Sequence, residues 1–310
     1  MDNVFCSVLS RTRLYQAIAL LCSLHTVKKA FILHILCVDD DTYNLLKKMD
    51  WDSVHLTHLD ELKNDTLDHL RKSRKQNEYC WTLKPVFLEY LFETNPDVER
   101  LTYIDADLFF FSDPEPVFIS QPHSSVLLSK GDIRIPTLGT RDTLTIQRIL
   151  GKYNSGFISF KRDETGLMAL DWWKEKCLDC CISMPEGGKF GDQKYLDELP
   201  QIFQNVSEIR TPGVNVGHWN SYYYNYSIYQ GNVYADLSPL ICYHFSGFRV
   251  VKGDKVVLIH EADRTSKPFF YDIYIGILMD IIESIRAIDP AFCGYSGKDD
   301  LGTQGLSIMG

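Results

Sequence analysis

Two aspartates separated by one residue follow a short apolar segment near the middle of the chain. Residues 101–104 have the composition of a buried strand, and Asp105-Ala106-Asp107 comes directly after them. Side chains at positions i and i+2 of an extended segment point to the same side, so both carboxylates can face one cation. A divalent cation held in this way can neutralise a diphosphate. Such triplets also occur in ordinary acidic turns, and we interpret the aspartates at 39–41 as a turn or helix cap.

A histidine late in the chain offers a third ligand for the same cation. His244 lies at the end of an apolar segment, residues 240–245, that reads as a strand. An imidazole nitrogen binds readily to a cation that carboxylates already hold. The alternative is a buried histidine with ordinary hydrogen bonds, and the two aspartates favour the ligand. We therefore predict that Asp105, Asp107 and His244 bind Mn²⁺ or Mg²⁺.

The elements that must position these residues alternate between strand and helix in the first part of the chain. Apolar runs indicate strands at 4–9, 30–38, 54–59 and 101–104, and amphipathic patterns indicate helices at 13–24, 42–49 and 81–93. This order predicts an α/β fold with a mostly parallel central sheet flanked by helices. Ligands of such sheets bind beyond the carboxyl ends of the strands, which is where the two acidic triplets lie.

The second part of the chain is less regular. Residues 211–234 are rich in Gly, Asn, Tyr and Trp and suggest loops that build a site, and 268–288 reads as a C-terminal helix. We predict a single domain over 1–290, with a first half at about 1–120 and a second half at about 121–260. The Gly-, Ser- and Asp-rich residues 291–310 are expected to form a flexible tail.

Several segments together resemble one known family. Residues 101–107, followed by Asp113-Pro114, resemble the nucleotide-diphosphosugar transferases of the GT-A fold, and most of all the retaining enzymes related to glycosyltransferase family 8. Four further segments resemble family motifs in the same order, and the resemblance spans roughly residues 3–250. These segments are Asn154-Ser155-Gly156, Gly191-Asp192-Gln193, the loop at 215–220 and the segment at 243–247.

The resemblance implies that the half at about 1–120 binds the nucleotide and that the half at about 121–260 binds the sugar and acceptor. It also implies roles for individual residues. Asp192 and Gln193 would be the catalytic pair near the reacting carbon, and Asn154, Ser155 and Gly156 would line the donor sugar. Further donor contacts would come from the residues of the other motifs and from the end of the first strand. These are Ser10, Arg11, Lys84, Asp105, Ala106 and Gly247.

Two positions leave alternatives open. Lys84 would bridge donor phosphate and sugar, but an ordinary solvated helix lysine is equally consistent with its sequence context. The family pattern HxxGxxK would place a lysine at position 250, where this chain has Val250. Either Arg249 or Lys252 could supply the missing cation.

The implied activity is metal-dependent transfer of a hexose, with retention, from a nucleotide-diphosphosugar, with UDP-sugar favoured. Retention can proceed by double displacement, with Asp192 as the nucleophile, or by front-face attack, in which Asp192 orients the sugar or acceptor. The aromatic residues 219–229 suggest a glycan or lipid-linked glycan acceptor and a role in polysaccharide biosynthesis. The alternative for this segment is a packed loop that braces the sheet.

Composition, charge and the absence of certain motifs narrow the remaining classes of function and partner. The chain of 310 residues carries a net charge of −9, which argues against a nucleic-acid partner. No signal peptide pattern is visible, so we expect a cytoplasmic protein, with peripheral association at the membrane surface as an option, and the sequence leaves the oligomeric state open. A nucleotidyltransferase is the rival enzyme, but the turn after the first strand lacks the glycines it needs. A catalytically silent binding module would be expected to lack an aspartate or the histidine.

Overall fold

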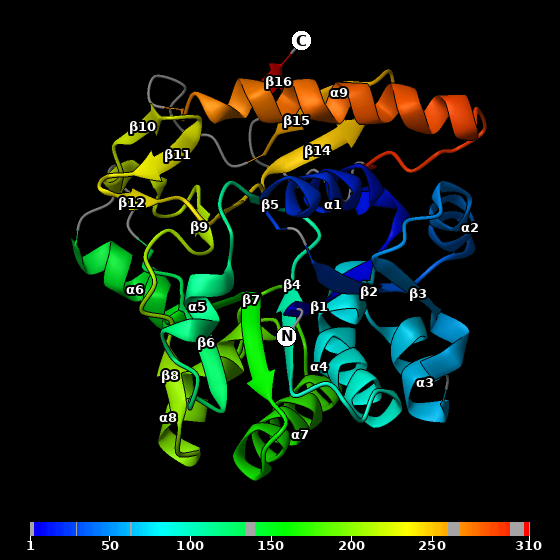
Figure 1. The fold of residues 1–310 in the computed structure, drawn as a ribbon. Coiled ribbons are helices and arrows are strands. Elements are labelled where there is room, and N and C mark those ends of the chain that lie inside the picture. Colours follow the sequence, from blue (N-terminus) through cyan, green and yellow to red (C-terminus); the bar gives the residue numbers. More distant parts are fainter. Residues whose placement is uncertain are drawn as a thin grey trace.

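A seven-stranded sheet with the order β3-β2-β1-β4-β7-β6-β8 forms the centre of the protein (Figure 1). The computed structural model describes residues 3–28, 30–62, 64–133, 140–259, 267–297 and 307–309. The first four strands of this order run parallel, β7 runs antiparallel to both of its neighbours, and β8 is parallel to β6. The strands are β1 (Asn3–Leu9), β2 (Phe31–Cys37), β3 (Val54–His58), β4 (Arg100–Ile104), β6 (Val126–Lys130), β7 (Tyr153–Lys161) and β8 (Val206–Glu208). The predicted α/β class with a mostly parallel sheet is confirmed.

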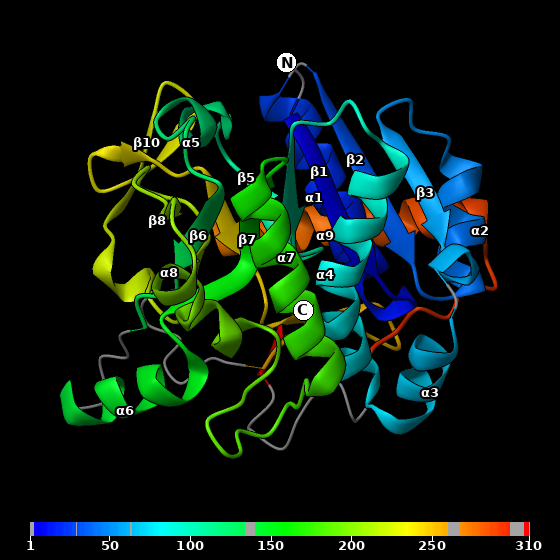
Figure 2. The ribbon, with the colours of Figure 1, turned by 90° about the horizontal axis from the view of Figure 1, so that it is seen from below.

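Helices cover both faces of this sheet. Figure 2 shows α4 and α7 in front of the strands and α9 behind them. The alternation of side chains along β1 explains the two layers, because Phe5 and Leu9 pack into one core and Cys6 and Val8 into the other. The larger helices are α1 (Leu14–Val27), α2 (Asp40–Met49), α3 (Asp65–Ser73), α4 (Gln76–Thr94), α6 (Thr140–Leu150), α7 (Glu164–Asp179) and α9 (Phe270–Ile288). The shorter ones are η1 (Arg11–Arg13), η2 (Leu59–Leu62), α5 (Glu115–Ile119), η3 (Gln193–Asp197), α8 (Leu199–Ile202) and η4 (Ser221–Tyr223).

A second, three-stranded sheet joins distant parts of the chain beside the carboxyl end of β4. It consists of β5 (Leu108–Phe110), β13 (Cys242–His244) and β9 (Val216–Gly217). β13 runs antiparallel to β5, and this pairing sets His244 opposite Leu108. Leu108 directly follows Asp107, so this pairing brings His244 beside the aspartate motif although the two are far apart in the sequence.

Two further small sheets complete the fold. One contains β10 (Tyr226–Tyr229), β11 (Asn232–Ala235) and β12 (Ser238–Pro239), and the other contains β14 (Phe248–Val251), β15 (Lys255–Leu258) and β16 (Ser307–Met309). The last of these belongs to the segment 291–310, which we expected to be a flexible tail. In that segment the amide of Ser296 also donates to the carbonyl of Val250 at 2.8 Å. Residues 298–306 and 310 lie outside the described residues.

No helix in the described part of the chain has both the length and the apolar composition needed to cross a membrane.

The buried histidine of β2 should make the folding stability depend on pH. His34 is 8% exposed, and burial, with a smaller contribution from His55, lowers its pKa from 6.5 to about 4. Between these two values the unfolded chain binds a proton that the folded chain does not, so the free energy of unfolding falls as the pH falls through this window. The unmodified protein should therefore lose on the order of 2–3 kcal/mol of its free energy of unfolding as the pH falls through this window, and we expect His34→Leu to remove this loss. Urea unfolding at about pH 7 and about pH 4.5 measures it.

The control for this measurement is His69→Leu, since His69 is exposed on α3. This variant should keep the pH dependence of the unmodified protein. An unchanged pH dependence in His34→Leu would contradict the assignment.

Candidate active site

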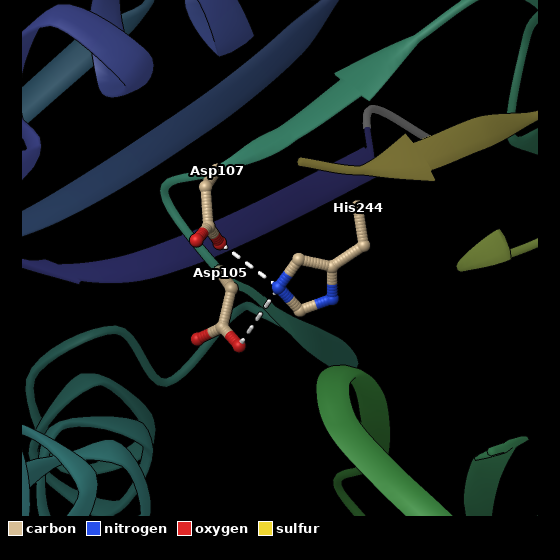
Figure 3. Close-up of side chains that lie close together, drawn as sticks. All are labelled: Asp105, Asp107 and His244. Carbon is tan, nitrogen blue, oxygen red and sulfur yellow. Dashed lines mark ion pairs between the residues drawn. The ribbon is translucent and has the colours of Figure 1, made fainter. Parts of the chain in front are cut away.

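Asp105, Asp107 and His244 converge where β4 ends and β5 begins (Figure 3). The Nε2 atom of His244 lies 2.9 Å from an Oδ1 oxygen of Asp107 and 3.7 Å from an Oδ2 oxygen of Asp105. One ligand atom from each side chain lies within 4.8 Å of the other two. The turn itself is fixed by the backbone, because the amide of Asp105 donates to the carbonyl of Gly156 at 2.8 Å. The geometry thus brings together the three predicted metal ligands.

A chain of side-chain amides determines which nitrogen of His244 faces the carboxylates. The amide of Gly156 donates to Asn154 Oδ1 at 2.9 Å, which identifies that atom as the oxygen. Asn215 Nδ2 donates to the same oxygen at 2.9 Å, so Asn215 Oδ1 must face the imidazole. It lies 2.9 Å from His244 Nδ1, which therefore carries a hydrogen. Nε2 is therefore the ring nitrogen that faces the two aspartates, and it would be the nitrogen that binds a cation.

This donor set fits a divalent cation. Carboxylate oxygens with one imidazole nitrogen suit Mn²⁺ and are compatible with Mg²⁺. Burial alone would raise the pKa of Asp107, but the attraction to His244, with smaller contributions from Arg13 and Arg249, holds it below its usual range. The carboxylate is therefore ionised, as a metal ligand must be.

Glycine is required at position 156 because of this packing. A Cβ atom added to Gly156 would lie 2.5 Å from Cε1 of His244. The strand β7 and the imidazole are thus in direct contact. The chain is packed equally closely where β9 ends, since a Cβ on Gly217 would lie 2.4 Å from the Trp219 ring. Trp219 in turn packs edge-on against His244, with ring centroids 5.2 Å apart.

Lys84 of α4 is a buried cation that joins the aspartate motif to Asp192. Its Nζ atom lies 2.9 Å from Asp105 Oδ1 and 3.3 Å from Asp192 Oδ2, and it donates to Ser155 Oγ at 3.1 Å. The side chain is 3% exposed, so it is not a solvated helix lysine. Burial alone would lower its pKa, but Asp105 and Asp192 raise the pKa above its ordinary value. The ammonium group stays charged.

Asp192 and Gln193 stand at the start of η3. Asp192 is 3% exposed, and burial raises the pKa of its carboxyl group against the opposing attraction of Lys84. Its Oδ2 atom has no aligned hydrogen-bond donor in the described part of the chain, although Lys84 is close. The backbone is held by Trp173, whose Nε1 donates to the Asp192 carbonyl at 2.9 Å. Gln193 donates to the Leu150 carbonyl at 2.8 Å, and its oxygen lies 3.4 Å from Asn154 Nδ2.

These side chains line a cleft of about 1010 Å³. Most of the residues predicted for the site lie on its wall, which supports their grouping by sequence. They are Ser10, Lys84, Asp105, Ala106, Asp107, Asn154, Ser155, Asp192, Gln193, His244 and Arg249.

Four predicted residues do not line the cleft. Arg11 is exposed and pairs with Asp41 at 3.4 Å, and Lys252 is exposed in the turn between β14 and β15. Gly156 and Gly247 are buried, the first behind His244 and the second in a backbone bond to Ile259.

Sequence reasoning missed other residues of the cleft wall. Arg13, Trp81 and Phe190 all line it, and Asn215 stands behind His244. Arg13 ends a run of four polar residues, 10–13, that gave no signal, but Asn215 opens a segment already matched to a family motif. Of the aromatic residues at 219–226, Trp219 lines the cleft, whereas Tyr222 and Tyr223 are 39% and 49% exposed outside its lining.

Comparison with known proteins identifies the family to which this chain belongs. The sequence profile of the nucleotide-diphospho-sugar transferases matches residues 32–199. The chain belongs to this family. The transferase is also 48% identical over 301 residues to the uncharacterized protein YfnF of Bacillus subtilis, covering 97% of this chain and 99% of that protein. It is 32% identical over 295 residues to the uncharacterized protein YfnD of the same organism, covering 93% and 92%.

Solved structures agree with the fold. The galactosyltransferase LgtC in complex with donor and acceptor sugar analogues superposes with a TM-score of 0.52, and an active-site mutant of LgtC with 0.54. Each comparison covers 91% of this chain and 95% of the other, at 12% sequence identity. The protein thus has the GT-A fold that the resemblance implied, and its family makes it a glycosyltransferase.

The buried ion pairs of Lys84 predict a large effect on stability. Lys84→Met would leave Asp105 and Asp192 without their shared cation, and we expect a loss of about 3–5 kcal/mol in the free energy of unfolding. Urea unfolding measures this loss. Lys130→Met is the matched control, because Lys130 pairs with Glu208 at the surface with 57% of its side chain exposed. It should cost under about 1 kcal/mol.

A second variant separates charge from packing. Lys84→Met combined with Asp192→Asn removes one uncompensated buried charge and should recover part of the loss. A double variant no more stable than Lys84→Met alone would show that the ion pair does not determine the effect.

Proposed function

We propose that this transferase binds a nucleotide-diphosphosugar, in the first place a UDP-sugar, through Mn²⁺ or Mg²⁺ held by Asp105, Asp107 and His244. It then moves the sugar to a hydroxyl group of a glycan or lipid-linked glycan. The observation that carries the proposal is the cluster of these three side chains at the wall of a large cleft. A cation held by these three side chains would neutralise the charge that develops on the leaving diphosphate.

The chain's own residues position the substrates around this cluster. Asn154 and Ser155 line the cleft on the side of β7 and would contact the donor sugar, while Ser10 and Ala106 lie at the ends of two parallel strands, on the side of the nucleotide. Arg249 lines the same cleft and is the cation that replaces the lysine of the family pattern. Lys84 holds Asp192 and Asp105 in fixed relation.

For the chemical step we propose retention with Asp192 as an orienting group. A nucleophile of a double displacement must reach the anomeric carbon with an accessible oxygen. The Asp192 side chain is 4% exposed, and its Oδ2 atom faces Lys84. Lys84 partly neutralises this carboxylate and so weakens it as a nucleophile, but Asp192 still lines the cleft and can accept hydrogen bonds from hydroxyl groups of the sugar or acceptor. Gln193, which donates to the Leu150 carbonyl, lies beside it.

For the acceptor side we propose a wall of aromatic rings. Trp81, Phe190 and Trp219 line the cleft. Flat rings suit the apolar faces of sugars, and the indole N–H groups of the two tryptophans suit their hydroxyl groups. Trp219 Nε1 is buried without a hydrogen-bond partner in the described residues, so a substrate oxygen would satisfy it. We place the reaction in polysaccharide biosynthesis in the cytoplasm, at the membrane surface where the acceptor is lipid-linked.

The metal ligands can be tested directly. We expect Asp107→Asn to weaken Mn²⁺ binding and to lower transfer by about 10²-fold or more, because a charged ligand becomes neutral. Isothermal titration with Mn²⁺ in the presence of UDP measures the binding. The matched control is Asp41→Asn, since Asp41 belongs to the other acidic triplet and lies outside the cleft. Full activity of Asp107→Asn in excess chelator would contradict the metal site.

Asp192 can be separated from donor binding. We expect Asp192→Ala to leave the Kd for Mn²⁺–UDP within about twofold and to lower kcat by about 10²-fold, since its role is confined to the sugar side of the cleft. The two quantities come from titration and from a transfer or donor-hydrolysis assay on the same preparation. An equal loss in both would assign Asp192 to structure or to phosphate binding.

A further inference from the structure

Arg13 is a cation of the donor cleft to which no motif assigns a role. It is the last residue of η1, directly after β1, and its backbone amide donates to the carbonyl of Ser10 at 2.9 Å. β14 packs against η1, so Arg13 and Arg249 come from neighbouring elements. Both line the cleft that holds Asp107 and His244. The carboxyl end of the first parallel strand thus contributes a guanidinium group to the site.

The Arg13 guanidinium forms no ion pair within 4.0 Å of a carboxylate in the described part of the chain, although it is near enough to Asp107 to help lower the pKa of that carboxyl group. Its NH1 atom is inaccessible to solvent and makes no hydrogen bond there. Arg11, two residues earlier, instead pairs with Asp41 at the surface. An inaccessible N–H group without an acceptor is unfavourable, and more so when it carries charge. An anionic ligand in the cleft would supply the missing acceptors once the side chain turns toward it.

Arg249 is held rigidly beside it. Its NH1 atom donates to the backbone carbonyls of Ser246 and Phe248, at 2.5 and 2.7 Å. Side chains of a strand alternate between its two faces, and Val250 is 2% exposed in the core. Arg249 therefore faces the cleft because the next residue faces the core. The lysine expected at position 250 would have pointed into that core in this strand.

We propose that Arg13 and Arg249 together bind the diphosphate of a nucleoside diphosphate beside the Asp105–Asp107–His244 cluster, with Arg13 on the second phosphate. Two guanidinium groups replace the one ammonium group of the HxxGxxK pattern. Each guanidinium presents several N–H donors in a planar fork and can engage two phosphate oxygens, which an ammonium group cannot do. The inference rests on the proposed function for the presence of the diphosphate, and it adds a ligand-binding residue to that function.

Calorimetric titration with three probes tests the role of Arg13. The probes are UDP, UMP and inorganic pyrophosphate, each with Mn²⁺. We expect Arg13→Met to weaken UDP and pyrophosphate binding by about 10- to 100-fold and UMP binding by less than about threefold, because charged hydrogen bonds to the second phosphate are lost. Arg13→Lys should recover only part of the affinity, since it keeps the charge and loses the fork. Arg148→Met, an exposed arginine of α6, should change none of these values.

Other outcomes overturn the inference. Equal losses for UDP and UMP would place Arg13 at the base, ribose or first phosphate, and unchanged pyrophosphate binding in both Arg13 variants would remove it from the site. A lowered Tm in both variants, with unchanged affinity for the folded protein, would assign Arg13 to structure. The proposed function fails separately, if the unmodified protein binds pyrophosphate but none of UDP, GDP, CDP, ADP or TDP.

Discussion

The buried ammonium group of Lys84 is the interaction on which the site depends. Asp105 and Asp192 approach it from different elements, and both carboxylates are largely withdrawn from water. Two such charges repel one another and are costly to bury, unless a cation lies between them. Because α4 supplies that cation, the Asp105–Asp107–His244 cluster and Asp192 are held in one fixed relation before any substrate binds. Tyr103 adds to this, since its hydroxyl donates to Asp105 at 2.9 Å.

Local signals predicted the parallel half of the fold and the place of the aspartates. Continuous apolar runs such as 30–38 indicate strands that are buried on both faces, and Asp105 follows the strand at 101–104 because chains turn at the carboxyl ends of parallel strands. Helix α3 was missed because Leu67 is its one fully buried residue, so its apolar stripe is thin. The first turn of α4 was also missed, since it is fixed by a hydrogen bond from the Lys75 amide to the Glu78 carboxylate at 3.1 Å rather than by apolar residues.

Features that depend on pairing between distant segments could not be predicted in the same way. Whether Arg249 or Val250 faces the cleft is decided by the register of β14 against β15, which sets Arg249 opposite Val257. The order of residues along the chain cannot distinguish Arg249 from Val250, because a shift of the strand pairing by one residue would exchange the cleft-facing and core-facing side chains. Lys84 was ambiguous for a related reason. Its helix is buried around most of its circumference, and a single lysine in such a helix is solvated or buried according to what covers that particular face.

The pairing of β5 with β13 determines when, during synthesis and folding, His244 joins Asp105 and Asp107. Both aspartates belong to the first half of the sequence, but the imidazole arrives only when β13 lines up along β5. Contacts between segments so far apart close a large loop of chain and form late in folding. During synthesis, a ribosome will already have released most of the parallel sheet before the third ligand is available. The proposed metal site is therefore complete only in a chain that extends through β13, and a product that stops before β13 lacks the imidazole of the cluster.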